Sequence, residues 1–180
     1  MKSLLGKILE HDGEFENIAL LGESAQTILK RLYKAFAISN LWMWCETPIG
    51  TIAQPALSDV TAGMSRELEA ALTLSPGTLL NVATETAGDD ADKLSAMLQY
   101  AWRIPPAGLN GIVFCVLDSQ IVQTEKVADG DETAAELLRA FRAVQRENLP
   151  FFLAFVGTDE TFQRLADNSA TDFFKKTVNC

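Results

Sequence analysis

The sequence predicts a three-layer α/β domain, with a mostly parallel sheet of about five or six strands and helices on both faces. Three apolar runs, LLNVA, GIVFCVL and FFLAFV, are nearly unbroken, which is typical of strands that are covered on both sides. Segments with helical spacing of apolar residues alternate with these runs, as in α/β folds. At 180 residues, with 48% hydrophobic residues, the chain is long enough to form one sizeable core.

The strands are expected where apolar runs are short and bounded by turn residues. They are Asn17–Leu21, Leu41–Cys45, Thr78–Ala83, Gly111–Leu117 and Phe151–Val156. Helices are expected where apolar residues recur every three or four positions. They are Ala25–Ala37, a helix marked by Met64, Leu68 and Leu72, Ala91–Trp102, Asp131–Asn148 and Thr161–Ala166.

The whole chain, residues 1–180, is interpreted as a single domain with two less regular parts. Residues 1–12 predict an N-terminal amphipathic helix with Leu5 and Ile8 on its apolar side. The proline-containing segment 47–76 is expected to be an excursion between the second and third strands. We find no internal repeat and no low-complexity linker.

Composition excludes several classes of function. The net charge is −9 and no basic patch is evident, so we expect no nucleic-acid partner. No apolar run reaches the length of a membrane span, and the N-terminus lacks the apolar core of a signal peptide. Three distant cysteines and a single histidine argue for a reducing, cytoplasmic location and against a metal site.

The stretch after the first strand keeps the frame of a phosphate-binding loop but not its chemistry. Gly22 ends the strand, but the following residues do not complete G-x-x-x-x-G-K-[ST]. If the loop is shortened by two residues, Gln26 takes the lysine position and Thr27 takes the hydroxyl position. The lysine is still missing, because Lys30 comes about one turn late, and Glu23 adds a negative charge. A plain strand-to-helix turn is therefore the favoured interpretation.

Two later strand ends carry weaker matches to nucleotide motifs. Glu85 and Gly88 stand where GTPases have Asp-x-x-Gly after the third strand, with a glutamate in place of the aspartate. Asp159 stands where the guanine-reading aspartate would follow the fifth strand, but the other residues of that motif are replaced. A helix cap is the simpler role for Asp159.

The order of these pieces resembles one family. The stretches IALLGES, TLLNVATETAG, PPAGLNGIVFCVL and LPFFLAFVGTDE are similar, in this order, to the cytoplasmic GTPase-like domain of IcmF-type components of type VI secretion systems. The resemblance covers most of the chain from Asn17 to about Asp167, and both nucleotide motifs are damaged. It implies a P-loop NTPase-like topology, a bacterial origin and a degenerate nucleotide site.

Two functions follow from this comparison. The first is a non-catalytic pseudo-GTPase that works as an adaptor or regulator, with a protein partner that belongs to a secretion apparatus and no cofactor. The alternative is a divergent nucleotide-binding hydrolase that binds GTP or ATP with magnesium. It would use Gln26, Thr27 and Glu85 around the phosphates, with Lys30 or an arginine supplied from elsewhere as the cation. The full set of degenerate nucleotide-site residues is Gly22, Gln26, Thr27, Glu85, Gly88 and Asp159. An unrelated hydrolytic enzyme is disfavoured, because no nucleophile elbow is present and the single histidine lies far from any strand end.

The adaptor hypothesis needs a surface for its partner. The strand with Trp42 and Trp44 is one candidate, since Trp is enriched in interface cores and the strand could lie at a sheet edge. The other is the N-terminal helix with Leu5 and Ile8. The opposing interpretation is that the tryptophans pack under helices of the same chain. The sequence gives no indication of the oligomeric state.

Overall fold

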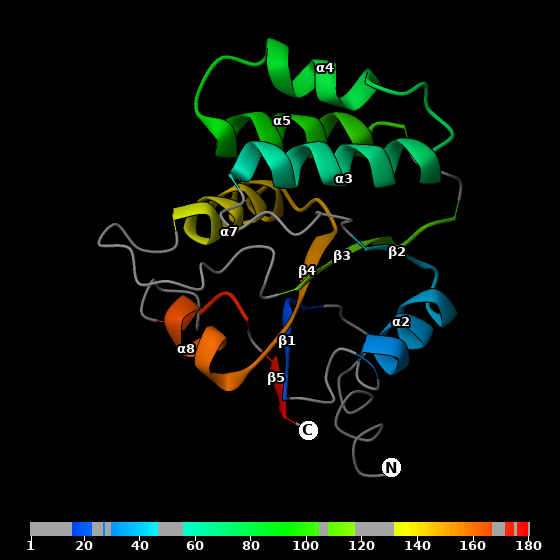
Figure 1. The fold of residues 1–180 in the computed structure, drawn as a ribbon. Helices are drawn as coiled ribbons and strands as arrows, with labels where there is room; N and C mark the ends of the chain where they lie inside the picture. The colour runs from blue at the N-terminus through cyan, green and yellow to red at the C-terminus, as the bar shows by residue number, and fades with distance from the viewer. Residues whose placement is uncertain are drawn as a thin grey trace.

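The chain folds as alternating strands and helices around one sheet (Figure 1). The computed structural model describes residues 16–22, 27, 30–46, 56–104, 108–117, 132–166, 172–174 and 176–179. The strands are β1 (Ile18–Leu21), β2 (Trp42–Glu46), β3 (Gly111–Leu117), β4 (Phe151–Gly157) and β5 (Lys176–Asn179). The helices are α2 (Lys30–Ser39), α3 (Leu57–Ala71), α4 (Thr78–Glu85), α5 (Asp90–Trp102), α7 (Glu132–Arg146) and α8 (Asp159–Ala166).

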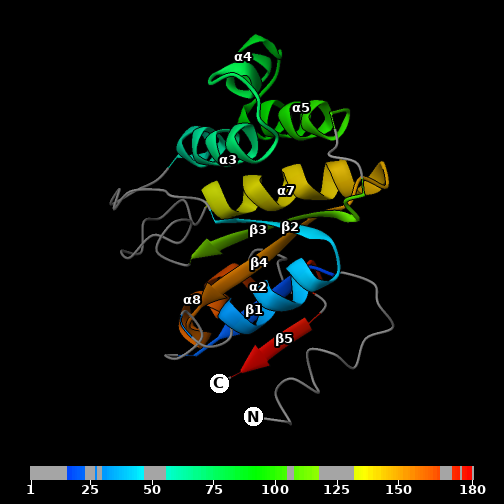
Figure 2. The same ribbon diagram turned by 90° about the vertical axis from the view of Figure 1, so that its right-hand side faces the viewer.

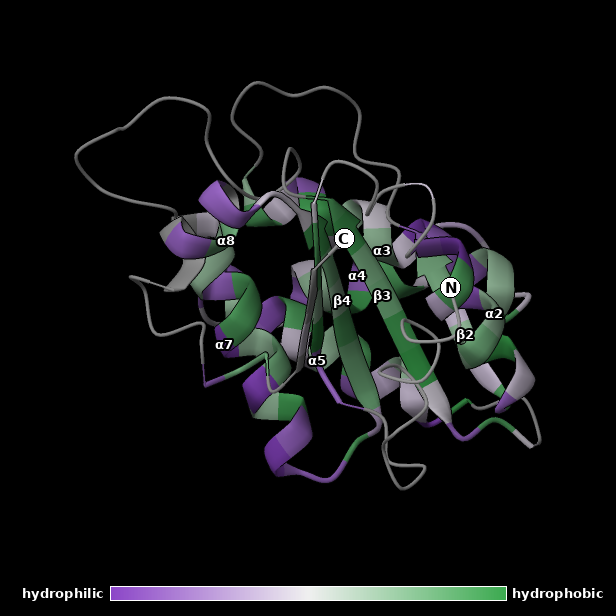
Figure 3. Cartoon of the chain, turned by 90° about the horizontal axis from the view of Figure 1, so that it is seen from below, coloured by the Kyte–Doolittle hydropathy of each residue, from purple (hydrophilic) through white to green (hydrophobic). Residues whose placement is uncertain are grey.

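The sheet has five strands in the order β2-β3-β4-β1-β5, and every pair of neighbours is parallel. This confirms the predicted sheet type. The core strands β3 and β4 are buried along almost their whole length, which explains their unbroken apolar sequences (green in Figure 3). Within the described residues, β2 and β5 form the two edges, so the prediction that the tryptophan strand lies at an edge is confirmed.

Helices cover both faces of the sheet, as predicted (Figure 2). On one face, Ile18 and Leu20 of β1 pack with Tyr33 and Ala37 of α2. On the other face, Ala19 and Leu21 belong to a larger core, to which α3, α7 and α8 contribute residues. Helices α5 and α4 lie beyond α7 and α3, with α4 outermost. The green and yellow helices of Figure 1 therefore form a helical layer stacked on one side of the sheet.

One expected strand is a helix. Thr78–Ala83 was predicted as the third strand, but Thr78–Glu85 forms α4 in the outer part of the helical layer. The buried carboxylate of Glu69 on α3 accepts hydrogen bonds from Gly77 N at 2.9 Å and Leu79 N at 2.7 Å. A carboxylate at the N-terminus of α4 accepts hydrogen bonds from backbone amides that have no partner within the helix. Its negative charge also compensates the positive end of the helix dipole, so it stabilises a helix here.

The excursion between the second and third strands is consequently longer than predicted. It runs from the end of β2 to the start of β3 and contains α3, α4 and α5. Residues 47–55 of the predicted excursion lie outside the described residues. The last strand, β5, was not predicted, because its sequence KTVN carries one apolar residue and gives no strand pattern.

The side-chain amides of Asn17 and Gln145, together called the amide clasp, join the start of β1 to β4 and α7. The buried Asn17 accepts a hydrogen bond from Leu153 N at 3.0 Å through its Oδ1 atom. The side chains of Asn17 and Gln145 exchange two further bonds of 3.1 and 3.0 Å, and Gln145 also donates to Phe151 O at 2.7 Å. These bonds fix the register of the two strands whose far ends border the candidate site.

None of the helices in the described part of the chain is long and apolar enough to cross a membrane.

Candidate functional site

The topology places the carboxyl ends of β1 and β4 side by side. These strands are neighbours, with Leu21 opposite Gly157. After β1 the chain enters α2 on one face and continues to β2, whereas after β4 it enters α8 on the other face and continues to β5. In α/β folds, ligands bind outside the carboxyl ends of adjacent strands whose connections leave in opposite directions. We therefore take this region, called the crevice below, as the candidate site.

Two of the predicted nucleotide-site residues border this crevice. Gly22 follows β1, and its N–H donates to Gly157 O at 3.0 Å, which extends the strand pairing by one step. Gly22 has a φ of 120°, a conformation that favours glycine. Asp159 is the exposed first residue of α8, two positions after Gly157. Thr27 is exposed on the way to α2, and Gln26 lies outside the described residues.

Glu85 and Gly88 do not belong to this crevice, so their predicted position after a sheet strand is wrong. Glu85 ends α4, and Gly88 lies in the turn that leads into α5, both in the helical layer. Gly88 has a φ of 122°, and an added Cβ would come within 2.9 Å of the Cβ of Asp92. A glycine at position 88 therefore leaves room for Asp92 at the capped start of α5.

The cap of α5 is a charged contact with α7. Asp89 Oδ1 accepts from Asp92 N at 3.1 Å and lies 2.7 Å from the guanidinium of Arg139. The hydrogen bond from Arg139 and those from the backbone lower the pKa of Asp89. Both side chains are exposed, so this pair orients α5 on α7 more than it stabilises the fold.

The lysine closest to the loop after β1 is held by a carboxylate. Lys30 Nζ lies 2.9 Å from Glu46 Oε2, and Lys34 Nζ lies 3.1 Å from Glu46 Oε1. Trp44 also donates its indole N–H to Glu46 Oε1 at 3.1 Å. Glu46 ends β2, and the two strands β3 and β4 separate β2 from β1. At about 4.8 Å per strand, the two strand ends are roughly 14 Å apart.

The protonation of Glu46 follows from these contacts. Partial burial raises its pKa, but the hydrogen bonds from Lys30, Lys34 and Trp44 and the charge of Lys30 outweigh that effect and lower the pKa to about 2. The carboxylate is therefore ionised at neutral pH and holds both ammonium groups at the end of β2.

The crevice itself has an acidic border. Asp159 and Glu160 occupy the first turn of α8, directly after β4. Phosphate groups in α/β folds are held by backbone amides and by cations, and carboxylates at the same place oppose them. The first turn of α8 thus places two carboxylates next to the carboxyl end of β4.

The two cysteines among the described residues offer no reactive thiolate. Cys45 and Cys115 are both buried, and burial raises the pKa of each to about 12. They belong to the cores on opposite faces of the sheet, so they do not pair with each other. No group of three histidine, cysteine or acidic side chains in the described segments could hold a metal ion.

The predicted partner residues on β2 are largely internal. Trp42 and Trp44 lie on one face, as their alternation predicted, but they pack under α2. The Trp42 ring meets Phe152 at 5.2 Å, and Trp44 meets Tyr33 at 5.9 Å, both edge to face. The interpretation that these tryptophans are core residues is the one the structure supports. Leu5 and Ile8 lie outside the described residues.

Sequence reasoning missed Glu46, although the signal was present. It directly follows the predicted strand Leu41–Cys45, just as Gly22 and Asp159 follow other predicted strands. Asp118 follows β3 in the same way, and its own structure lies outside the described residues. Testing every polar residue after an apolar run would have found both.

Comparison with known proteins identifies no family. No protein-family model matches the chain, and no curated protein matches it. Among solved structures, it is similar to the Orc1 protein of Aeropyrum pernix in complex with DNA, with a TM-score of 0.49 and 10% sequence identity. The match covers 98% of this chain and 42% of that protein, so the chain spans less than half of its length. The resemblance to IcmF-type domains stays a prediction.

Proposed function

We propose that this chain is a non-catalytic adaptor or regulatory protein, which keeps the framework of a nucleotide-binding α/β domain without binding a nucleotide. The observation that carries the proposal is the 2.9 Å ion pair between Lys30 and Glu46. Lys30 is the only lysine within a turn or so of the position where a phosphate loop needs one. Because Glu46 pairs with the ammonium group of Lys30 at the end of β2, that ammonium group does not point to a ligand between β1 and β4.

The remaining groups at the crevice support the same conclusion. A phosphate site needs compensating positive charge, and α8 instead begins with two acidic residues. Glu85 lies in the helical layer, so it cannot supply the magnesium contact that the alternative assigned to it. A cytoplasmic location and the absence of a nucleic-acid partner remain predictions of composition and charge.

The alternative, a divergent nucleotide hydrolase, keeps one favourable observation. Asp118 follows the buried strand β3, and an acid at the end of such a strand holds magnesium in P-loop enzymes. Such an enzyme would use Gly22 and Thr27 near the phosphates and would need a cation from another molecule. Titration of the protein with nucleotide and magnesium separates the two functions.

Exposed residues at the start of the predicted strand Leu41–Cys45, rather than its tryptophans, support a partner surface there. Ile38 at the end of α2 and Leu41 before β2 are 55% and 59% exposed. Leu41 has a φ of 60°, which costs a bulky residue about 1–2 kcal/mol. Two exposed apolar side chains next to an edge strand are suited to contact with another protein. We take the partner to be a secretion-apparatus component from the sequence resemblance alone.

The partner surface is tested by cross-linking and affinity capture from the native cell. Leu41→Glu should release any partner that the unchanged protein retains, without altering the melting temperature, because Leu41 is on the surface. Tyr100→Glu is the matched control, since Tyr100 is an exposed apolar residue at 37% on α5, in the helical layer. A partner that is retained equally by both variants would contradict the proposed surface.

A further inference from the structure

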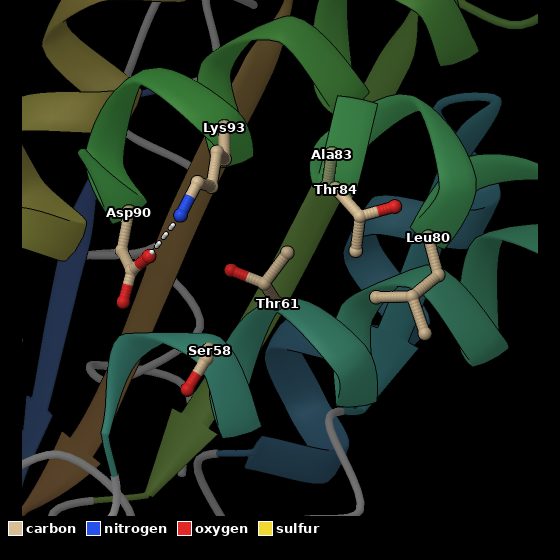
Figure 4. Close-up of a pocket in the computed structure, with 7 residues that line it drawn as sticks. All are labelled: Ser58, Thr61, Leu80, Ala83, Thr84, Asp90 and Lys93. Atoms are coloured by element: carbon tan, nitrogen blue, oxygen red, sulfur yellow. Dashed lines mark hydrogen bonds and ion pairs between the residues drawn. The ribbon is translucent and has the colours of Figure 1, made fainter. Parts of the chain in front are cut away.

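We propose that a pocket among α3, α4 and α5 is a binding site for a small ring compound that carries a carboxamide. The pocket lies in the helical layer and is separate from the crevice at the strand ends, so it does not depend on the proposed function. It is lined by residues of all three helices, which are Ser58, Thr61, Leu80, Ala83, Thr84, Asp90 and Lys93 (Figure 4).

The size of the pocket fits one ring with a substituent. Its volume is about 190 Å³. For comparison, an apolar cavity of about 150 Å³ in another protein holds one benzene molecule. On one side, Leu80 and Ala83 of α4 give an apolar surface against which a ring can pack. A ligand with about nine non-hydrogen atoms would fill this space.

The opposite wall carries one negative and one positive group. Asp90 Oδ1 and Lys93 Nζ form an ion pair of 3.0 Å, and both side chains are more than one third exposed. Figure 4 shows this pair on α5, facing Ser58 and Thr61 of α3 across the pocket. The wall is neutral overall, so it gives no net attraction to an anion or a cation. It offers instead an acceptor and a donor side by side.

The threonine hydroxyls add acceptors rather than donors. Thr61 donates its hydroxyl hydrogen to Leu57 O at 2.8 Å, and Thr84 donates to Asn81 O at 3.0 Å. Their oxygen lone pairs are what they can still present to a ligand. The ammonium of Lys93 has further N–H groups beyond the one that meets Asp90. A matching ligand therefore brings N–H donors and one carbonyl oxygen close together.

A carboxamide meets these requirements in one planar group. Its NH₂ can donate to Asp90 or to a threonine oxygen, while its carbonyl accepts from Lys93. A carboxylate lacks the donors, and an ammonium lacks the acceptor. The apolar face of Leu80 and Ala83 requires the rest of the ligand to be a hydrocarbon or aromatic ring. The chemistry of the pocket thus fits a neutral aromatic amide of this size.

The experiment is an NMR titration of the full-length protein with benzamide, observed through the methyl groups of Leu80, Ala83 and Thr61. We expect saturable shifts with a Kd on the order of 1 mM, as for other ligands of this size. Ser58→Phe places a ring at the edge of the pocket from an exposed position and should weaken binding at least tenfold. Ser75→Phe, the same change at an exposed turn outside the pocket, should leave binding unchanged.

Two further measurements test whether both polar groups of the amide are recognised and whether a loss of binding reflects a loss of folding. Benzoate and benzylamine should bind at least fivefold more weakly than benzamide, because each lacks half of the polar pair. Lys93→Met should lower benzamide affinity while the melting temperature changes little, since the removed ion pair is exposed. Absence of saturable shifts, equal binding by Ser58→Phe and Ser75→Phe, or equal affinity for the charged analogues would each overturn the proposal.

Discussion

Replacing Asn17 with alanine should lower the free energy of unfolding by about 3 kcal/mol. The change leaves Leu153 N–H without its partner, and Leu153 is fully buried on β4. An unpaired buried N–H costs roughly 1–3 kcal/mol. The two bonds between Asn17 and Gln145 are lost as well, at about 1 kcal/mol each, and water recovers part of this because Gln145 is only half-buried.

Urea unfolding followed by circular dichroism measures this change. With a slope of about 2.5 kcal/mol/M, the midpoint should fall by about 1 M for Asn17→Ala. A double-mutant cycle with Gln145→Ala should give a coupling of roughly 1–2 kcal/mol, because the two amides share two bonds. The control is Gln99→Ala, which removes a similar amide bond to Glu147 on the surface and should cost less than about 0.5 kcal/mol.

The clasp would be refuted as a determinant of the sheet by either of two results. One is a loss for Asn17→Ala no larger than that for Gln99→Ala. The other is a coupling near zero between Asn17 and Gln145, which would mean that the three bonds do not form together.

Three other predictions concern single residues. Glu69→Ala should cost about 2–3 kcal/mol by leaving two amides of the α4 cap unpaired, while Glu69→Gln, which keeps one acceptor, should cost less; thermal melting compares the two. Gly111→Ala should reduce the yield of folded protein or the melting temperature strongly, because the new Cβ would lie 2.6 Å from Pro150 O and against the Trp42 ring. The pKa of Glu46 falls from 4.5 to about 2 on folding, so its stabilisation is present above pH 4.5 and is lost as the pH falls toward 2. Glu46→Gln should therefore flatten the acid limb of a stability–pH curve, by about 1 kcal/mol after solvent screening; an unchanged curve would contradict the ion pairs.

Most of the sheet could be predicted because its strands are buried on both faces. Such strands need apolar residues at every position, so β3 and β4 appear in the sequence as unbroken runs. The same signal was misleading at Thr78–Ala83, where an apolar run of this length suits a helix equally well. What decides the outcome there is Glu69, whose carboxylate comes from another helix eight to ten residues away. A local pattern cannot report such a contact.

The candidate site was predictable only in part. Gly22 and Asp159 could be placed together, because parallel strands end at the same edge and the residues after them meet there. Glu85 and Gly88 were misplaced together with the strand that was expected before them. Lys30 begins α2, the helix that follows β1, whereas Glu46 ends β2, which lies three positions from β1 in the sheet. Only the strand order shows that these two residues can meet.

The most direct test of the proposed function is a calorimetric titration of GTP and ATP, with magnesium, into the full-length protein. We predict no binding tighter than about 1 mM, because the loop after β1 presents no free lysine and α8 begins with acids. Glu85→Ala is the control, since Glu85 lies in the helical layer and should have no effect. Micromolar affinity for either nucleotide that is abolished by Thr27→Ala would contradict the account and establish the divergent hydrolase in its place.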